Sequence, residues 1–226
     1  MFDIYFSPSR AFGRLKEKPT WLIPLIIALV FNMLVSLLSA QFIDRDKIRQ
    51  AAVEAMQKQN LSEEQIKQQT DRMETWFSNP LARYGAPPVS ALFGSLIGFL
   101  FLAVVYNVSL PLLGGTSDFK RTWAIVCNAS LVAVPATIVR GGLVLLKRSA
   151  EVTTSLLAAA PAIKQPFLKG LLAQLDIFDF WKFMLIAIGL KVVFGLKDSK
   201  SYTLVFAVWV VVMLLLALLG MGAGGR

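Results

Sequence analysis

The sequence predicts an all-α, polytopic membrane protein with five transmembrane helices and an extramembrane helical hairpin between the first and the second. Apolar residues make up 56% of the 226 residues and charged residues only 16%, and the mean hydropathy is +0.62. A soluble domain carries about 25% charged residues, so this chain is too apolar to form a surface in water. The apolar residues also gather into five runs close to the roughly 20 residues that cross a bilayer.

The five runs define the elements in order along the chain. The expected spans are residues 21–40, 87–113, 122–140, 176–194 and 202–222. The fifth run is the most apolar, because twelve of its residues from Tyr202 to Leu219 are Leu, Val or Phe, and these favour insertion by roughly 4–7 kcal/mol. The fourth run is the weakest. Tight loops are expected at 114–121 and 195–201.

Two segments are amphipathic but too interrupted to span, and we expect both at the membrane interface. The amino-terminal segment 1–20 places aromatic residues beside four bases. Segment 141–175 alternates leucines with lysines and arginines, among them Lys164, and is broken by Pro161 and Pro166. The aromatic residues of the first segment are Phe2, Tyr5, Phe6 and Phe12.

The residues from 41 to 86 form the only segment with a soluble character. It is rich in helix-forming Gln, Glu, Lys and Ala, and Ser62 with Gln65 forms a capping-box pattern. We therefore expect two helices, over 43–59 and 63–77. They either pack on their own apolar stripe as a solvated hairpin or offer residues 41–77 to a protein partner.

The orientation depends on the basic residues around the spans. Arg10, Arg14, Lys16 and Lys18 precede the first span and favour a cytoplasmic amino terminus. With that orientation the inner segments hold eight Lys and Arg residues and the outer segments thirteen, so the full count is indecisive. The net charge of +9 lies mostly beside apolar runs, where it suits anionic lipid head groups, and we expect no nucleic-acid partner.

Polar residues inside the spans are the candidate site. Asp176 and Asp179 stand at the start of the fourth span, and Lys182 lies one turn after Asp179. An i,i+3 ion pair that anchors the span is one interpretation, and an ion or proton site is the other. Asn107 and Asn128, together with Asn32, either bond one another between helices or line a polar path.

A second candidate feature is a stripe of small residues on the second span. Ser90, Gly94 and Gly98 recur every four residues, and small residues at that spacing let helices approach closely. The stripe is expected to pack either within the bundle or in a homodimer.

Catalysis and cofactor binding are not expected from this sequence. The chain has no histidine and a single cysteine, Cys127. This excludes His-based metal sites, Ser-His-Asp and Cys-His catalysis and an intrachain disulfide. No catalytic, cofactor-binding or metal-binding residue can be assigned.

Three stretches carry a resemblance to a known family. They are Ser7-Pro-Ser-Arg-Ala-Phe12 before the first span, Gly114-Gly-Thr-Ser-Asp-Phe-Lys-Arg121 between the second and third, and Leu175-Asp-Ile-Phe-Asp-Phe-Trp181 at the fourth. The chain resembles the bacterial branch of the Yip (Ypt/Rab-interacting) membrane proteins. The resemblance implies five spans, a cytoplasmic amino terminus and, for a bacterial member, the cytoplasmic (inner) membrane with the carboxyl terminus outside. The Asp-Leu-Tyr-Gly-Pro motif and long amino-terminal region of the eukaryotic members are missing, so Rab binding is not expected.

Two functions follow as hypotheses. The first is a non-enzymatic membrane scaffold or membrane-organising protein of Yip type, whose working surfaces are the hairpin and the small-residue stripe. The second is a small transporter or channel that uses the polar residues within the spans.

Overall fold

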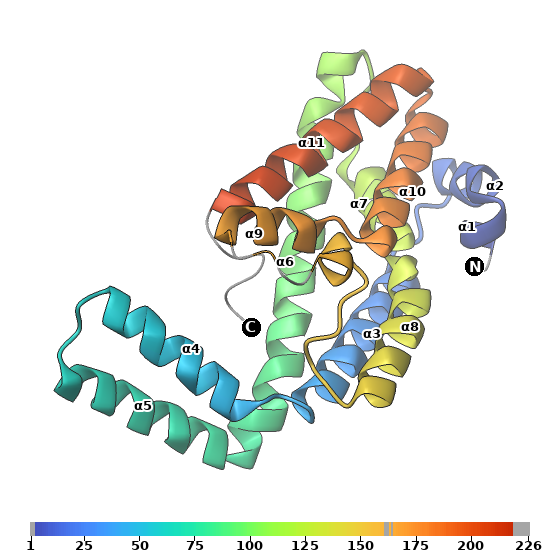
Figure 1. Cartoon of the computed structure of the whole chain (residues 1–226). Helices are drawn as coiled ribbons and strands as arrows, with labels where there is room; N and C mark the ends of the chain where they lie inside the picture. The colour runs from blue at the N-terminus through green and yellow to red at the C-terminus, as the bar shows by residue number, and fades with distance from the viewer. Residues whose placement is uncertain (1–2, 161–162, 164, 219–226) are drawn as a thin grey trace.

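The computed structural model describes residues 3–160, 163 and 165–218, and in this part of the chain the fold is helical without strands. Phe2, Pro161 and Lys164 of the expected interfacial segments lie outside the described residues. So does the part of the expected fifth span after Leu218, up to residue 222. Helices α3, α6, α7, α8, α10 and α11 form a bundle, and α4 and α5 extend from it as a separate pair (Figure 1). The helix bounds are α1 Asp3–Phe6, α2 Pro8–Gly13, α3 Leu22–Ala40, α4 Arg45–Lys58, α5 Glu63–Ser78, α6 Ala86–Ser109, α7 Phe119–Ala129, α8 Ala133–Lys147, α9 Pro166–Gln174, α10 Ile177–Phe194 and α11 Asp198–Leu218.

Four helical stretches of the described chain are long and apolar enough to cross a membrane. They are Leu22–Ala40, Leu81–Leu113, Phe119–Lys147 and Asp198–Leu218. Helix α10 is not among them, because its 18 residues include Asp179, Lys182 and Lys191. It is nevertheless a continuous helix with many buried side chains, so the most charged helix of the bundle is surrounded by protein.

The second span begins earlier than the expected residue 87. A short π-helical stretch, Leu81–Gly85, leads directly into α6. Three prolines lie at these helix starts: Pro80 precedes the π-helical stretch, and Pro87 and Pro88 lie in the first turn of α6. Pro80 costs no hydrogen bond, because the N–H groups at the start of a helix have no intrahelical acceptor.

The third span also differs from the expected 122–140. Helices α7 and α8 are joined by one 3₁₀ turn, Ser130–Val132, and α8 continues past Arg140 to Lys147. Residues 141–147, expected in the interfacial segment 141–175, therefore belong to the span helix. The reason is that the Arg140 charge is paired within the protein and does not end the helix.

The loop before the last helix is shorter than the expected 195–201. Gly195 ends α10 with a left-handed conformation (φ +67°), which glycine adopts without steric cost. Helix α11 then starts at Asp198, four residues before the expected span. An acidic side chain is favourable at that end of a helix dipole.

The amino-terminal helices pack into the bundle and do not only lie at an interface. Ile4, Phe12 and Leu15 are buried in the same core as α7 and α10. Tyr5 donates a hydrogen bond to the Leu131 carbonyl (2.7 Å), whereas Phe6 is 88% exposed. Of the aromatic residues expected to contact lipid, Phe12 therefore serves as a core residue.

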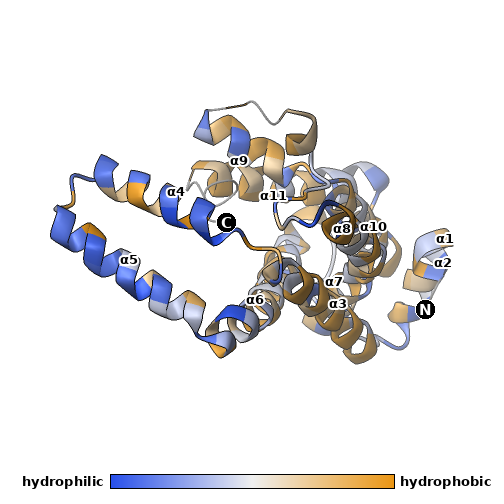
Figure 2. Ribbon diagram, turned by 60° about the horizontal axis from the view of Figure 1, so that its bottom comes forward, coloured by the Kyte–Doolittle hydropathy of each residue, from blue (hydrophilic) through white to orange (hydrophobic). Residues whose placement is uncertain are grey.

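Helices α4 and α5 are joined by a short connection and lie side by side (Figure 1). The capping box expected at the start of α5 is confirmed, because Ser62 and Gln65 exchange side-chain and backbone hydrogen bonds. Met56 of α4 and Thr70 of α5 are buried. Figure 2 shows hydrophilic residues dominating both helices, in contrast to the hydrophobic α3, α8 and α10.

Candidate functional site

Asp176 is the centre of the polar cluster in the bundle. It caps α10, and its Oδ1 accepts the Phe178 backbone N–H (2.8 Å). Its side chain is only 5% exposed. A buried carboxylate is costly unless it is paired and hydrogen-bonded, and the neighbouring segments supply both kinds of partner.

Arg140 on α8 is the charged partner of Asp176. Its Nη2 lies 2.9 Å from Asp176 Oδ1, its Nε donates to Thr154 Oγ1 (3.0 Å), and its guanidinium lies 5.7 Å from the centre of the Phe178 ring. Thr154 in turn donates to Asp176 Oδ2. The three side chains form a closed cluster that joins α8, the connection after it and the start of α10.

Asp179 and Lys182 form a second ion pair one turn further along α10. Lys182 Nζ lies 2.7 Å from Asp179 Oδ1, as the i,i+3 spacing predicts, and 4.9 Å from the centre of the Phe183 ring. No hydrogen bond or ion pair of the described residues joins this pair to the Asp176 cluster, although both occur at the same end of α10. Lys191, near the other end, pairs with Asp198 (2.6 Å).

The three asparagines bond to other partners instead of to one another. Asn128 donates to the carbonyls of Thr20 and Ala124, Asn107 accepts from Thr122 (3.4 Å), and Asn32 donates to Ser95 (3.2 Å). The expected Asn–Asn contacts are therefore wrong. Asn32 joins α3 to α6, Asn107 joins α6 to α7, and Asn128 joins α7 to the segment before α3. The described contacts join neither Asn107 nor Asn128 to Asp176 or Asp179.

The small-residue stripe does not pack against another helix of the described residues. Ser90 bonds only to carbonyls of its own helix, Ala86 and Pro87, and a Cβ added at Gly94 or Gly98 would meet no described atom within 4 Å. The prediction that this stripe packs inside the bundle is therefore wrong for the described residues. The homodimer face stays a prediction, which light scattering of the detergent-solubilised protein would test.

Arg140 and Thr154 are the site residues that sequence reasoning missed. Arg140 was expected to end the third span, and Thr154 falls in a connection without regular structure. The available signal was a single base followed by further apolar residues up to Leu146, which is expensive in a span unless a carboxylate pairs with it.

Two cavities of the described chain lie away from this cluster. One of about 300 Å³ is lined by residues of α11 and by Leu113, and one of about 490 Å³ lies on α4. Among the described residues, no group of three or more Asp, Glu or Cys side chains could hold a metal ion. The cluster can thus fix two helices and the connection between them.

The fold and the site together define a polytopic helical membrane protein in which the charged side chains of α10 pair within the chain. Its family is evident from comparison with known proteins: the chain belongs to the Yip1 domain family, whose model matches residues 2–220. This confirms the resemblance of the sequence to Yip proteins. The chain is 25% identical over 232 residues to "Membrane protein YknW" of Bacillus subtilis (strain 168), which covers 99% of this chain and 92% of that relative. No solved structure matches significantly.

Proposed function

We propose that this chain is a non-enzymatic membrane scaffold that crosses the bilayer five times and holds a protein partner through the α4–α5 hairpin. The observation that carries the proposal is the contrast between a bundle of apolar helices and one hydrophilic helix pair extending from it (Figure 2). The family and the apolar helices place the chain in a membrane. The bacterial inner membrane and a cytoplasmic amino terminus belong to the proposal.

The fifth span in this proposal is α10. It is 18 residues long, which is about 27 Å of helix and close to the thickness of the hydrocarbon layer. Its charges are met by protein groups: Asp179 pairs with Lys182 near one end, and Lys191 pairs with Asp198 near the other. Charges placed at the two ends of a span and paired there are tolerated in bilayers.

We predict that Lys147 and Ser199 lie on opposite sides of the membrane. In a Cys127→Ala background, Lys147→Cys and Ser199→Cys should react with a membrane-impermeant maleimide from different compartments, and Thr116→Cys should behave like Ser199→Cys. Thr116 is the matched control, because Lys200 next to Ser199 donates to the carbonyl of Leu113 (2.8 Å) and so ties the two loops together. Labelling of positions 147 and 199 from the same side would exclude α10 as a span.

The hairpin has the surface of a protein-binding element. Acidic and basic side chains are interspersed along both helices, and Trp76 is 42% exposed near the end of α5. Exposed tryptophan is enriched where proteins bind one another. Arg45 lies over the ring of Phe77 (5.9 Å) and keeps the ends of α4 and α5 together.

An ion pair connects the hairpin to the bundle. Lys47 Nζ of α4 lies 3.0 Å from Glu151 Oε1 in the connection that follows α8. The hydrogen bond to Glu151 raises the pKa of the Lys47 ammonium. The favourable contact is therefore fully present at neutral pH, and on the alkaline side it is lost as the pH rises through the raised pKa.

We expect a photo-crosslinking amino acid at position 76 to capture a protein partner in native membranes. The matched control is the same amino acid at position 101 on α6, where Phe101 is also exposed (51%) but faces outward from a span. Replacement of residues 44–78 by a flexible linker should abolish reciprocal purification of the captured partner while membrane insertion is retained. Equal capture at both positions, or purification unaffected by the replacement, would contradict the scaffold proposal.

The transporter or channel hypothesis gains no support from the described structure. Asp176, Asp179, Asn107 and Asn128 all have protein partners, and they do not line the cavities at α11 and at α4.

A further inference from the structure

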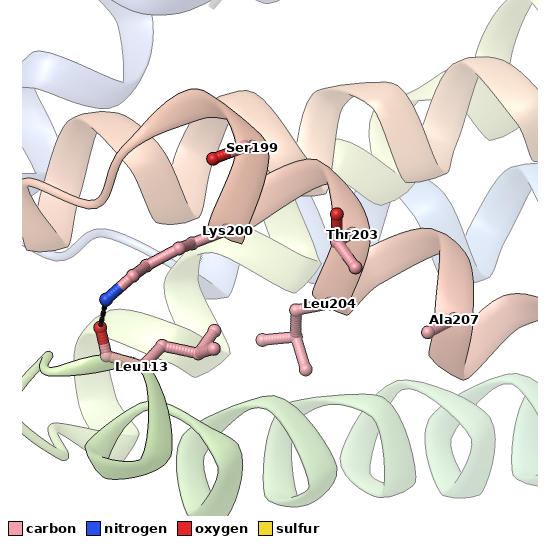
Figure 3. A pocket seen from close by; sticks show the side chains of 6 residues that line it. All are labelled: Leu113, Ser199, Lys200, Thr203, Leu204 and Ala207. Atoms are coloured by element: carbon pink, nitrogen blue, oxygen red, sulfur yellow. Dashed lines mark hydrogen bonds between the residues drawn. The ribbon is translucent and has the colours of Figure 1, made fainter.

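A cavity of about 300 Å³ lies between the start of α11 and the end of α6, at the opposite end of α10 from Asp176. Figure 3 shows Lys200, Thr203, Leu204 and Ala207 along α11, with Leu113 across from them. Lys200 is three or four residues before Thr203 and Leu204, and Ala207 is three or four residues after them, so these α11 positions share one face of the helix. Ser199 completes the lining.

The lining changes from polar to apolar along the helix. Ser199, Lys200 and Thr203 provide two hydroxyl groups and an ammonium, and the apolar Leu204 and Ala207 follow further along α11 toward its carboxyl-terminal end. Lys200 and Ala207 are seven residues apart, which is about 10 Å of helix. Leu112, beside Leu113, is 85% exposed, so the cavity opens beside an apolar surface.

The charge at the polar end is positive. Asp198 is occupied by Lys191 (2.6 Å), whereas the described ion pairs give Lys197 and Lys200 no carboxylate partner. Lys200 Nζ donates one hydrogen bond to the Leu113 carbonyl (2.8 Å). An ammonium has three donors, so two remain for a ligand at the mouth of the cavity.

We propose that this cavity binds an anionic phospholipid of the surrounding bilayer. Its phosphate is held by Lys200 with Ser199 and Thr203, and the first part of one acyl chain lies along Leu204 and Ala207. The polar, positively charged end and the apolar end of the lining are about 10 Å apart along α11. A single ligand that fits both ends must carry a negative charge next to hydrocarbon, as an anionic phospholipid does. The proposal does not depend on the partner of the hairpin.

The test is native mass spectrometry of the full-length protein titrated with phosphatidylglycerol and phosphatidylcholine of identical acyl chains. We expect the wild type to prefer phosphatidylglycerol about tenfold, because both lipids offer the same phosphate but the choline ammonium cancels the net negative charge that attracts Lys200. Lys200→Gln keeps a donor for Leu113 but removes the charge and should abolish the preference, and Lys200→Arg should retain it. Ala207→Leu should reduce the binding of both lipids, because it fills the acyl end.

Lys147→Gln is the matched control, since it removes an exposed base on α8, away from the cavity. It should leave lipid binding unchanged. The proposal is overturned if the wild type binds both lipids equally, if Lys200→Gln keeps the preference, or if Lys147→Gln removes it as effectively. It is also overturned if soluble glycerol phosphate binds as tightly as the lipid, because the acyl contact would then contribute nothing. Circular dichroism of each variant verifies that the helices are retained.

Discussion

Replacement of Arg140 by methionine should lower the free energy of unfolding by about 3 kcal/mol, at the lower end of the range for breaking a buried ion pair. The variant leaves Asp176 buried at 5% exposure with no cationic partner, and the remaining Thr154 and Phe178 contacts do not neutralise its charge. Steric-trapping or denaturant unfolding in a defined detergent measures the change.

The reverse variant should cost less. Asp176→Asn still accepts the Phe178 N–H and leaves the charge on Arg140, whose side chain is 34% exposed and can be hydrated. The double variant Arg140→Met/Asp176→Asn should recover most of the loss of Arg140→Met, because no unpaired charge remains. If the double variant is as unstable as the sum of the two single variants, the ion pair is not what holds α8 to α10.

Phe12→Ala should destabilise the protein by about 3 kcal/mol, near the lower end for truncating a buried aromatic ring. Phe12 is fully buried, and its ring packs so closely on α10 that a Cβ added at Gly189 would lie 3.1 Å from it and 2.5 Å from Ile125. Loss of the ring leaves a cavity there and frees α1 and α2. Limited proteolysis should then cut the amino-terminal segment faster than in the wild type.

Phe6→Ala is the matched control, because Phe6 belongs to the same segment and is 88% exposed. It should change neither stability nor proteolysis. Gly189→Ala adds a methyl group where α10 meets the Phe12 ring, and this overpacking should lower the free energy of unfolding by about 1–3 kcal/mol. Equal effects of Phe6→Ala and Phe12→Ala would show that the docking of the segment does not depend on the Phe12 ring.

Local sequence signals predicted the local structure well. The capping box of Ser62 and Gln65 placed the start of α5, and the i,i+3 spacing of Asp179 and Lys182 predicted their ion pair. Both features depend on residues within one turn of a helix, where geometry follows from sequence separation alone.

The features that the sequence did not predict depend on contacts between distant segments. Arg140 and Asp176 meet only because α8 and α10 pack together with the connection between them, and no local spacing encodes that contact. Phe12 looked like a lipid-facing aromatic residue, since Gly189, which receives its ring, lies far away in sequence. The small-residue stripe shows the opposite error, because a pattern typical of helix packing has no partner in the described chain.

The seating of Phe12 against Gly189 has a consequence for biosynthesis. Helices α1 and α2 leave the ribosome before α10, which provides their docking surface, so their apolar side chains stay uncovered while the helices in between are made. Truncated products that lack α10 would therefore retain an uncovered α1–α2 segment for quality-control proteases to recognise.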